Sequence, residues 1–539
     1  MSLRNRFVLP FILSTLAILS ACGGSSSPPV VAPPTGGFST SNLNGTYVFS
    51  VSGTDTVGAP YALVGTFTAN GTGGITGGTV DVTDLSIGQI ANSPVSNNGT
   101  YQIGVDGRGR AALGTSTPFG TIIFTFALQD SAHGLITQFD GNASGSGTMD
   151  LQTSGVSPVG SYAFSFSGAD STGNAFVTIG DFSLGAGGAI SAGLQDFNDG
   201  GFPFPDEALT GTVVVGPSST PATTLTAAQL GAFTYDVYAV DANHLKFIEM
   251  DGLGTLAGDA FSQTSTTVPT GALAFALEGF TLSGPTAAGG FMVTDGAGAI
   301  TNASTEDVNA NLSISPTPLV FSGSYAVAGA GRYTLNLATG GFFGGTTYAA
   351  YPYSGGLFLL EIGNDSIIMA GAAYPQSDAT FAADQGYALN LTGINALALG
   401  TGAVEVDDIA EFTAANSGTT VTGLIDENFA PGGIPTFKIP LNGTYTAPDT
   451  SGRGFVSAAG GNSSISTLNG GFLLTFYSVD GTTFPFIESD NGQVAAGVFV
   501  QQNASASASA AAAKAHMFVV RPLVKAHAVQ PKKNQPKNR

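Results

Sequence analysis

The chain has 539 residues, of which 77 are glycine and only 9% are charged, against roughly 25% in ordinary soluble domains. Its 36 acidic and 15 basic residues give a formal net charge of −21, which argues against nucleic acid as a partner. The single cysteine, Cys22, excludes disulfide bonds within the chain.

The first element is an export signal. Arg4 and Arg6 precede an apolar stretch from Phe7 to Leu19, which is shorter than the roughly 20 residues that span a bilayer. The stretch ends in Leu19-Ser20-Ala21-Cys22, which resembles the lipobox of bacterial lipoproteins. The alternatives are an ordinary cleaved signal peptide and an uncleaved transmembrane helix.

The resemblance implies that residues 1–21 are removed and that the thiol of Cys22 receives a diacylglyceryl group. The new amino terminus is then acylated, as with palmitate, and the acyl chains make the membrane a partner. Gly23 follows the cysteine in place of the aspartate that retains some family members at the inner membrane, so the resemblance favours the outer membrane. With Cys22 lipidated, no thiol remains for catalysis, redox chemistry or zinc.

Residues 22–42 form a tether. The stretch from Gly23 to Asn42 is rich in Gly, Ser and Pro and carries no charge. A flexible segment of this length spans roughly 25 Å on average.

The body of the chain is predicted to be all-β and built from four tandem units. The phrase Gly45-Thr46-Tyr47 returns as Gly160-Ser161-Tyr162, and more loosely from Gly271 and Gly386. A glutamine closes each unit, at Gln152, Gln263, Gln376 and Gln501. Repeats of about 110 residues are large enough to be domains, which we place at 43–157, 158–268, 269–380 and 381–503.

Each unit is predicted to be an antiparallel meander of about eight strands. In the first unit, apolar residues alternate and turn residues such as Asn70-Gly71 and Asp106-Gly107 intervene. The predicted strands are 46–52, 61–69, 75–82, 99–105, 110–114, 121–129, 135–140 and 147–152. We expect a small up-and-down barrel in each unit, with a β-sandwich as the main alternative and one large transmembrane barrel as a third.

Acids and amides recur after the third strand of each unit. Clustered carboxylates could supply part of a calcium site, although no complete calcium loop is present. The alternative is that these side chains cap turns through the backbone. The candidate calcium ligands are Asp81, Asp84, Asp196, Asp199, Glu306, Asp307, Asp426 and Glu427, and Asn198, Asn309 and Asn428 accompany them.

Two further positions recur. A carboxylate or amide interrupts an apolar strand at Gln138, Glu249, Glu361 and Glu488, and an arginine follows the fourth strand at Arg108, Arg332 and Arg453. Because a buried carboxylate needs a partner or a proton, we predict that each arginine reaches the Glu or Gln of its own unit across the barrel interior. The alternative is a solvated rim, and unit two lacks the arginine.

Signals of catalysis are few. His133 and His244 occupy the same turn in two units, but a zinc site needs three or four ligands. We find no Gly-x-Ser-x-Gly elbow, His-Glu-x-x-His motif or phosphate-binding loop. A hydrolase with two paired carboxylates needs no sequence motif and stays open.

Residues 504–539 form the tail, which is rich in Ala and Ser and then basic, with no acid. It is predicted to be disordered, or to bind anionic lipid or glycan or the acidic body through its charge.

Taken together, these elements predict a non-enzymatic, lipid-anchored envelope protein that displays four β domains and binds an unidentified surface ligand. The alternatives are lipocalin-like barrels that hold a small apolar ligand, and a secreted hydrolase. The sequence predicts no cofactor beyond the calcium candidates and does not indicate an oligomeric state.

Overall fold

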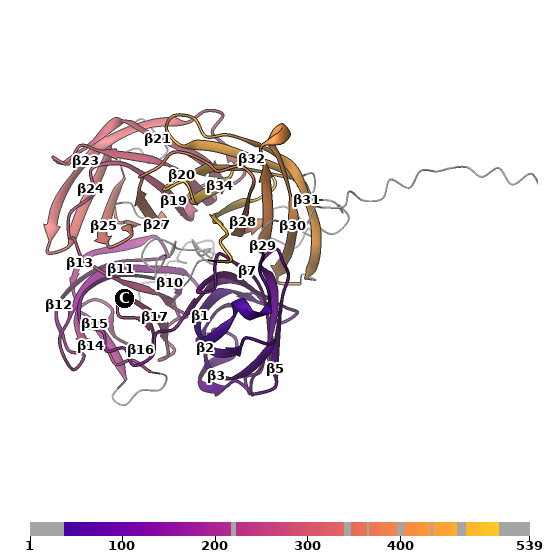
Figure 1. The fold of residues 1–539 in the computed structure, drawn as a ribbon. Coiled ribbons are helices and arrows are strands. Elements are labelled where there is room, and N and C mark those ends of the chain that lie inside the picture. The colour runs from indigo at the N-terminus through magenta and orange to yellow at the C-terminus, as the bar shows by residue number, and fades with distance from the viewer. Residues whose placement is uncertain are drawn as a thin grey trace, which may run out of the picture. The chain divides into compact units, whose positions relative to one another are not determined.

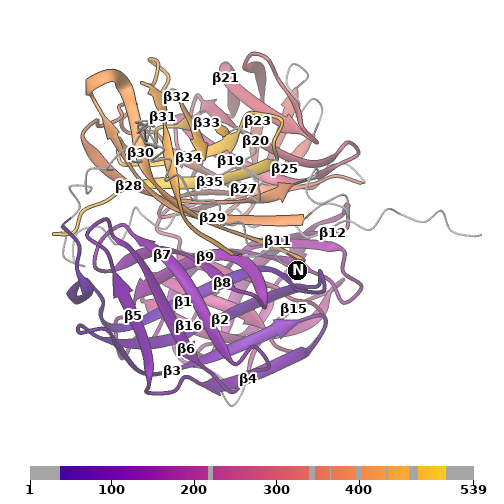
Figure 2. The ribbon, with the colours of Figure 1, turned by 90° about the vertical axis from the view of Figure 1, so that its right-hand side faces the viewer.

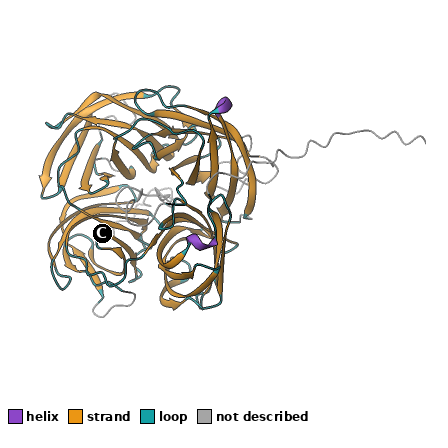
Figure 3. Ribbon diagram, viewed as in Figure 1, coloured by secondary structure: helices purple, strands orange, loops and turns teal. Residues whose placement is uncertain are grey.

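The structure is a computed structural model that describes residues 37–505, except 217–221, 339–345, 364–365, 396–403, 433–434 and 461–470. Cys22, the signal peptide, most of the tether and the basic tail lie outside the described residues. Figure 3 shows that strands dominate the described part, with loops and turns between them. Its helical elements are the 3-10 turns η1 (Thr40–Asn42) and η3 (Ser417–Thr419), and none of its helices is long and apolar enough to cross a membrane.

Barrel 1 contains nine strands. It is drawn in indigo and purple in Figure 1. Eight of the strands close in the order β2-β1-β9-β8-β7-β6-β5-β3, because β2 also pairs with β3, and β4 adds to the outer edge of β3. The strands are Asn44–Asp55 (β1), Pro60–Asn70 (β2), Gly74–Asp84 (β3), Gly88–Pro94 (β4), Gly99–Ile103 (β5), Arg108–Gly114 (β6), Thr121–Leu128 (β7), His133–Asp140 (β8) and Ala143–Leu151 (β9).

Barrel 2 repeats this order with its own outer strand, β13. Its closing edges meet through the bridge between Ala189 and Thr212 and through the hydrogen bond from Leu209 N to Gly193 O, 2.9 Å. The strands are Gly160–Ala169 (β10), Ala175–Leu184 (β11), Ile190–Asp199 (β12), Phe202–Ala208 (β13), Thr210–Thr212 (β14), Thr223–Ala227 (β15), Gly231–Asp241 (β16), His244–Glu249 (β17) and Ala257–Ser262 (β18).

Barrel 3 closes as barrel 1 does, since β20 pairs with both β19 and β21. The strands are Gly271–Thr281 (β19), Gly284–Thr294 (β20), Ala299–Ala310 (β21), Ser313–Ile314 (β22), Leu319–Gly329 (β23), Arg332–Ala338 (β24), Thr347–Tyr353 (β25), Gly356–Glu361 (β26) and Ile368–Pro375 (β27).

Barrel 4 is a closed barrel of eight strands and has no added outer strand among the described residues. The strands are Gln385–Asn395 (β28), Val404–Ala415 (β29), Thr420–Ala430 (β30), Thr436–Thr446 (β31), Arg453–Gly460 (β32), Phe472–Tyr477 (β33), Thr483–Glu488 (β34) and Val494–Gln501 (β35).

The predicted all-β architecture of four repeated antiparallel barrels is confirmed. In each barrel the first strand pairs with the last, and the register repeats: Tyr47 lies opposite Leu151, and Tyr387 lies opposite Gln501. The curved strands β7, β8 and β9 of the first barrel can be followed side by side in Figure 2. Strand β4 was not predicted, because its polar sequence lacks alternation and Asn92 interrupts it with a φ of 54°.

The interior of each barrel is filled by its own side chains. Four buried clusters, one per barrel, are rich in Phe and Tyr. In barrel 4, the ring of Phe499 lies 4.8 Å from that of Phe484 and 5.2 Å from that of Phe476, measured between centroids. A lipocalin-like function would need an open lumen, and these rings occupy it.

Several strands are buried on both faces, which an isolated barrel would not require. Every residue of β8, β17, β26 and β34 is buried. A fifth apolar cluster accounts for the outer faces, because it draws residues from all four barrels, among them Ala127, Ile179, Tyr351 and Ile409. The barrels therefore share a core in addition to their own interiors.

Truncating Phe499 to Ala should lower the free energy of unfolding by about 3–5 kcal/mol, because the ring is fully buried among other rings. Urea denaturation followed by circular dichroism measures the change. The matched control is Val57→Ala, whose side chain is 74% exposed and should matter little. Equal stability of the two variants would contradict the packed interior.

Candidate functional site

The three recurring arginines lie at junctions between barrels. Each binds an aspartate on the third strand of a neighbouring barrel. Arg332 of barrel 3 donates from Nε to Oδ2 of Asp196 in barrel 2 at 2.7 Å, and a second bond joins Nη2 to Oδ1. The remaining pairs are Arg453 with Asp307, at 2.8 and 2.7 Å, and Arg108 with Asp426, at 3.2 Å.

This result corrects the predicted partner of each arginine. Sequence repetition suggested a pair within one unit, such as Arg332 with Glu361, whereas the arginines point outward and bind the preceding barrel of the cycle. The side chain of Gln138, the proposed partner of Arg108, instead accepts a hydrogen bond from Tyr61 at 2.8 Å.

A tyrosine completes two of these pairs. The hydroxyl of Tyr351 donates to Asp196, and that of Tyr477 donates to Asp307 at 2.8 Å. Burial by itself lowers the pKa of the Arg332 guanidinium, but the hydrogen bond and charge of Asp196 outweigh burial and raise that pKa. The guanidinium therefore stays charged at any physiological pH.

A second set of contacts comes from the recurring residue two positions after each aspartate. Each donates from its side chain to backbone carbonyls at the strand ends and turns of the next barrel. The bonds are Thr83 to Gly254 at 3.1 Å, Asn198 to Ile367 at 2.8 Å, Asn309 to Glu488 at 3.0 Å and Asn428 to Ala143 at 2.9 Å.

The closing glutamines make a third set. Each amide donates to a carbonyl of the next barrel: Gln152 to Ala239 at 2.9 Å, Gln263 to Pro352 at 2.8 Å, Gln376 to Ser478 at 3.0 Å and Gln502 to Leu128 at 2.8 Å. In the fourth unit, Gln502 therefore takes the place that we assigned to Gln501.

The junction contacts form a closed cycle, because they join barrel 1 to 2, 2 to 3, 3 to 4 and 4 back to 1. The chain itself connects only the first three of these pairs. The 4–1 junction depends wholly on contacts such as Arg108 with Asp426 and Asn428 with Ala143. The repeats are consequently one block and not a flexible string of domains.

The predicted calcium ligands divide between these junctions and local turns. Asp196, Asp307 and Asp426 bind arginine, as described, while Asp84 accepts the backbone N–H groups of Ser86 and Ile87 and so caps a turn. Glu306 and Glu427 are fully buried, and Asp199 is half-buried. Among the described residues, no group of three or more His, Cys, Asp or Glu side chains could hold a metal ion.

The two turn histidines have carboxylate partners. His133 Nδ1 lies 3.0 Å from Oδ1 of Asp130, and His244 Nε2 lies 2.8 Å from Oδ1 of Asp259. Burial lowers the pKa of His133, but its hydrogen bond to Asp130 outweighs this effect and raises the pKa. The carboxylates thus hold the rings within the barrel walls.

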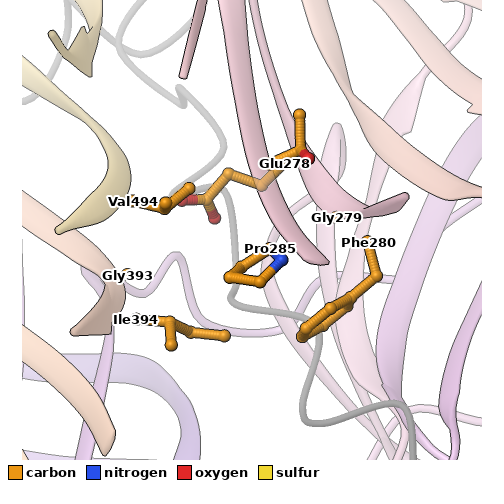
Figure 4. A pocket seen from close by; sticks show the side chains of 8 residues that line it. Glu278, Gly279, Phe280, Pro285, Gly393, Ile394 and Val494 are labelled. Carbon is orange, nitrogen blue, oxygen red and sulfur yellow. The ribbon is translucent and has the colours of Figure 1, made fainter. Parts of the chain in front are cut away.

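A small pocket opens at the 3–4 junction (Figure 4). Glu278 and Pro285 of barrel 3 and Ile394 and Val494 of barrel 4 line it. Its cavity volume is about 10 Å³, about the space that one water molecule needs. It is too small for an organic substrate.

Three buried acids on strand β29 of barrel 4 have raised pKa values. Burial, followed by the charges of neighbouring acids, raises the pKa of Asp408 well above its ordinary value, and neither of its oxygens has a hydrogen-bond partner. Burial also raises the pKa of Asp407 to about 6 and that of Glu411 to about 8. At pH 7 Glu411 therefore favours the protonated form, whereas Asp407 is mostly ionised.

Comparison with known proteins gives no relative of this sequence. No protein-family model matches the chain, and no curated protein matches it. Among solved structures, it is similar to a variant of transferrin-binding protein B from Haemophilus parasuis, with 9% identity and a TM-score of 0.19 over 69% of this chain and 83% of that chain. Transferrin-binding protein B from Neisseria meningitidis gives 10% identity and a TM-score of 0.19, over 70% and 82%. Similarity this low carries no functional argument.

Replacing Arg332 with Met should cost about 3–5 kcal/mol of stability, because Asp196 would remain buried without a cation. The double variant Arg332→Met with Asp196→Leu should recover much of this loss. Thermal unfolding measures both, and Arg110→Met, at an exposed arginine, is the control. No recovery in the double variant would contradict the pairing.

Stability should fall as pH rises from 5 to 8. The pKa of Glu411 is higher in the folded protein than in the unfolded chain. The protonated side chain therefore contributes its full stabilisation below the unfolded pKa, and this contribution is lost as the pH rises to about 8. The expected loss from this group is about 1.4 kcal/mol per pH unit. Glu411→Gln should flatten the profile measured by urea denaturation, whereas Asp378→Asn, at an exposed site, should leave it steep.

Proposed function

We propose that this protein is a lipid-anchored, non-enzymatic component of the cell envelope that presents one block of four β-barrels as a binding surface. The observation that carries the proposal is the closed cycle of junction contacts around barrels with filled interiors. A block of this kind presents a large surface of constant geometry, and so it loses little conformational entropy on binding.

The placement of the polar groups supports a binding role over catalysis. The recurring acids, amides and arginines are bound to one another or to backbone groups at the junctions. A catalytic group must instead reach a substrate in a cleft. Asp408, a described carboxyl group with no hydrogen-bond partner among the described residues, is buried.

The distribution of charge indicates the kind of partner. Four of the six basic side chains in the described chain form buried or half-buried ion pairs, namely Arg108, Lys246, Arg332 and Arg453. Only Arg110 and Lys438 are exposed. The described chain has more exposed acids than these two exposed cations. The exposed aspartates are Asp206, Asp251, Asp295, Asp378, Asp384 and Asp449. The surface is therefore acidic and suits a cationic partner.

The location rests on the lipobox resemblance at Cys22. Acyl chains on this residue would hold the protein at the membrane, and residues 22–42 would separate the first barrel from it. Gly23 favours the outer membrane within that resemblance.

The anchor is tested by labelling expressing cells with an alkyne analogue of palmitate. The full-length protein should take up label and sediment with membranes, and Cys22→Ser should lose both properties because it lacks the acylated thiol. Ser20→Ala is the control, since it leaves the thiol in place. Labelling and sedimentation of Cys22→Ser like the parent protein would contradict the proposal.

A further inference from the structure

The 1–2 junction departs from the repeated pattern in its charge. Asp81 of barrel 1 occupies the position of Asp196, Asp307 and Asp426, and Tyr238 of barrel 2 donates to its Oδ2 at 2.6 Å. Barrel 2, however, contributes no arginine: its only basic residue is Lys246. Asp81 is completely buried, and no cation among the described residues pairs with it, whereas each of the other three junctions has an arginine.

Where the other junctions have an arginine, the 1–2 junction has a second carboxyl group near Asp81, that of Asp236. Asp236 lies two residues before Tyr238 on β16 and is only 4% exposed. The residues that correspond to Asp236 in barrels 1, 3 and 4 are Thr125, Ala349 and Thr475, and none of them carries a charge. Asp236 is thus particular to the junction that lacks arginine.

Two buried carboxyl groups in contact cannot both ionise cheaply. Asp236 lies on the same face of β16 as Tyr238, whose hydroxyl reaches Asp81, so the two buried carboxyl groups are neighbours and a proton on one of them relieves their repulsion. The backbone N–H of Asn92 and the hydroxyl of Tyr238 fill further acceptor positions on Asp81. Burial raises the pKa of Asp81 to about 7, and Asp236 contributes to the rise.

The other charged groups that the structure describes at this junction have their own partners. Lys246 Nζ lies 3.0 Å from Oδ2 of Asp150 and 3.0 Å from Oδ1 of Asp259. His244 also contacts Asp259. The pair of Lys246 with Asp150 joins the two barrels whatever the state of Asp81, and residues 152–159 keep them connected.

We propose that the 1–2 junction is a proton-dependent latch, in which a proton shared by Asp81 and Asp236 does what arginine does at the other three junctions. Loss of this proton leaves two buried negative charges opposite each other across the junction. The barrels then separate locally around Tyr238, while the three arginine junctions stay closed.

The pH dependence follows from linkage. The pKa of Asp81 is higher in the closed junction than in the open one, so closure binds a proton. Local opening should become about tenfold easier with each pH unit between the open and closed pKa values, and should level off above about 7. The equilibrium constant for local opening should therefore rise with pH below about pH 7 and stay constant above it.

Hydrogen exchange with mass spectrometry tests the latch on the full chain at pH 5, 6, 7 and 8. Protection factors, corrected for the intrinsic exchange rate, should fall with pH in peptides that cover residues 88–95 and 232–241. Peptides that cover residues 303–309 and 472–478, at the 3–4 junction, are the internal reference, since Arg453 pairs with Asp307 there.

Three variants distinguish the latch from general loosening. Asp81→Asn should abolish the slope between pH 5 and pH 7. Asp236→Asn should move its midpoint to lower pH, because the amide can donate to Asp81. Tyr238→Phe should move it to higher pH, since one hydrogen bond to the carboxylate is lost. An unchanged slope in a folded Asp81→Asn variant, or the same slope at both junctions of the parent, would overturn the proposal.

Discussion

Burial of both faces of the barrel strands is the constraint on which the rest of the structure depends. The inner faces pack aromatic rings within each barrel, and the outer faces of strands such as β8 and β26 join a core shared by all four barrels. The charged fraction of only 9% is consistent with this arrangement, since much of what would be surface in a single barrel is interior here.

The polar groups at the junctions determine how the barrels meet. Apolar packing alone tolerates sliding, whereas an Asn that donates to a chosen carbonyl and an Arg that binds one Asp allow a single register. Thr83 and the three equivalent asparagines show how constant this arrangement is. The cyclic closure then turns four similar domains into one surface, on which the proposed binding role rests.

Much of the fold was predictable because strand periodicity and repeat spacing are local signals. The period-two pattern around Tyr47 and the return of the opening phrase at Tyr162 predicted the meander and the four units. The two-sided burial also has a local signal, which we did not use: the unbroken apolar run Leu357-Phe358-Leu359-Leu360 is typical of a strand covered on both faces. The outer strand β4 has no such signal.

The sequence by itself determined that the chain forms repeated antiparallel barrels, and it identified the recurring arginines, acids and amides as a related set. Only the tertiary structure decided their partners. Repetition shows which positions are equivalent, but it does not show whether Arg332 meets a residue of its own copy or of the preceding one. That choice depends on the face of the strand and the packing between barrels, both of which are long-range properties. For the same reason, only the structure showed that Asp81 and Asp236 meet where an arginine is missing.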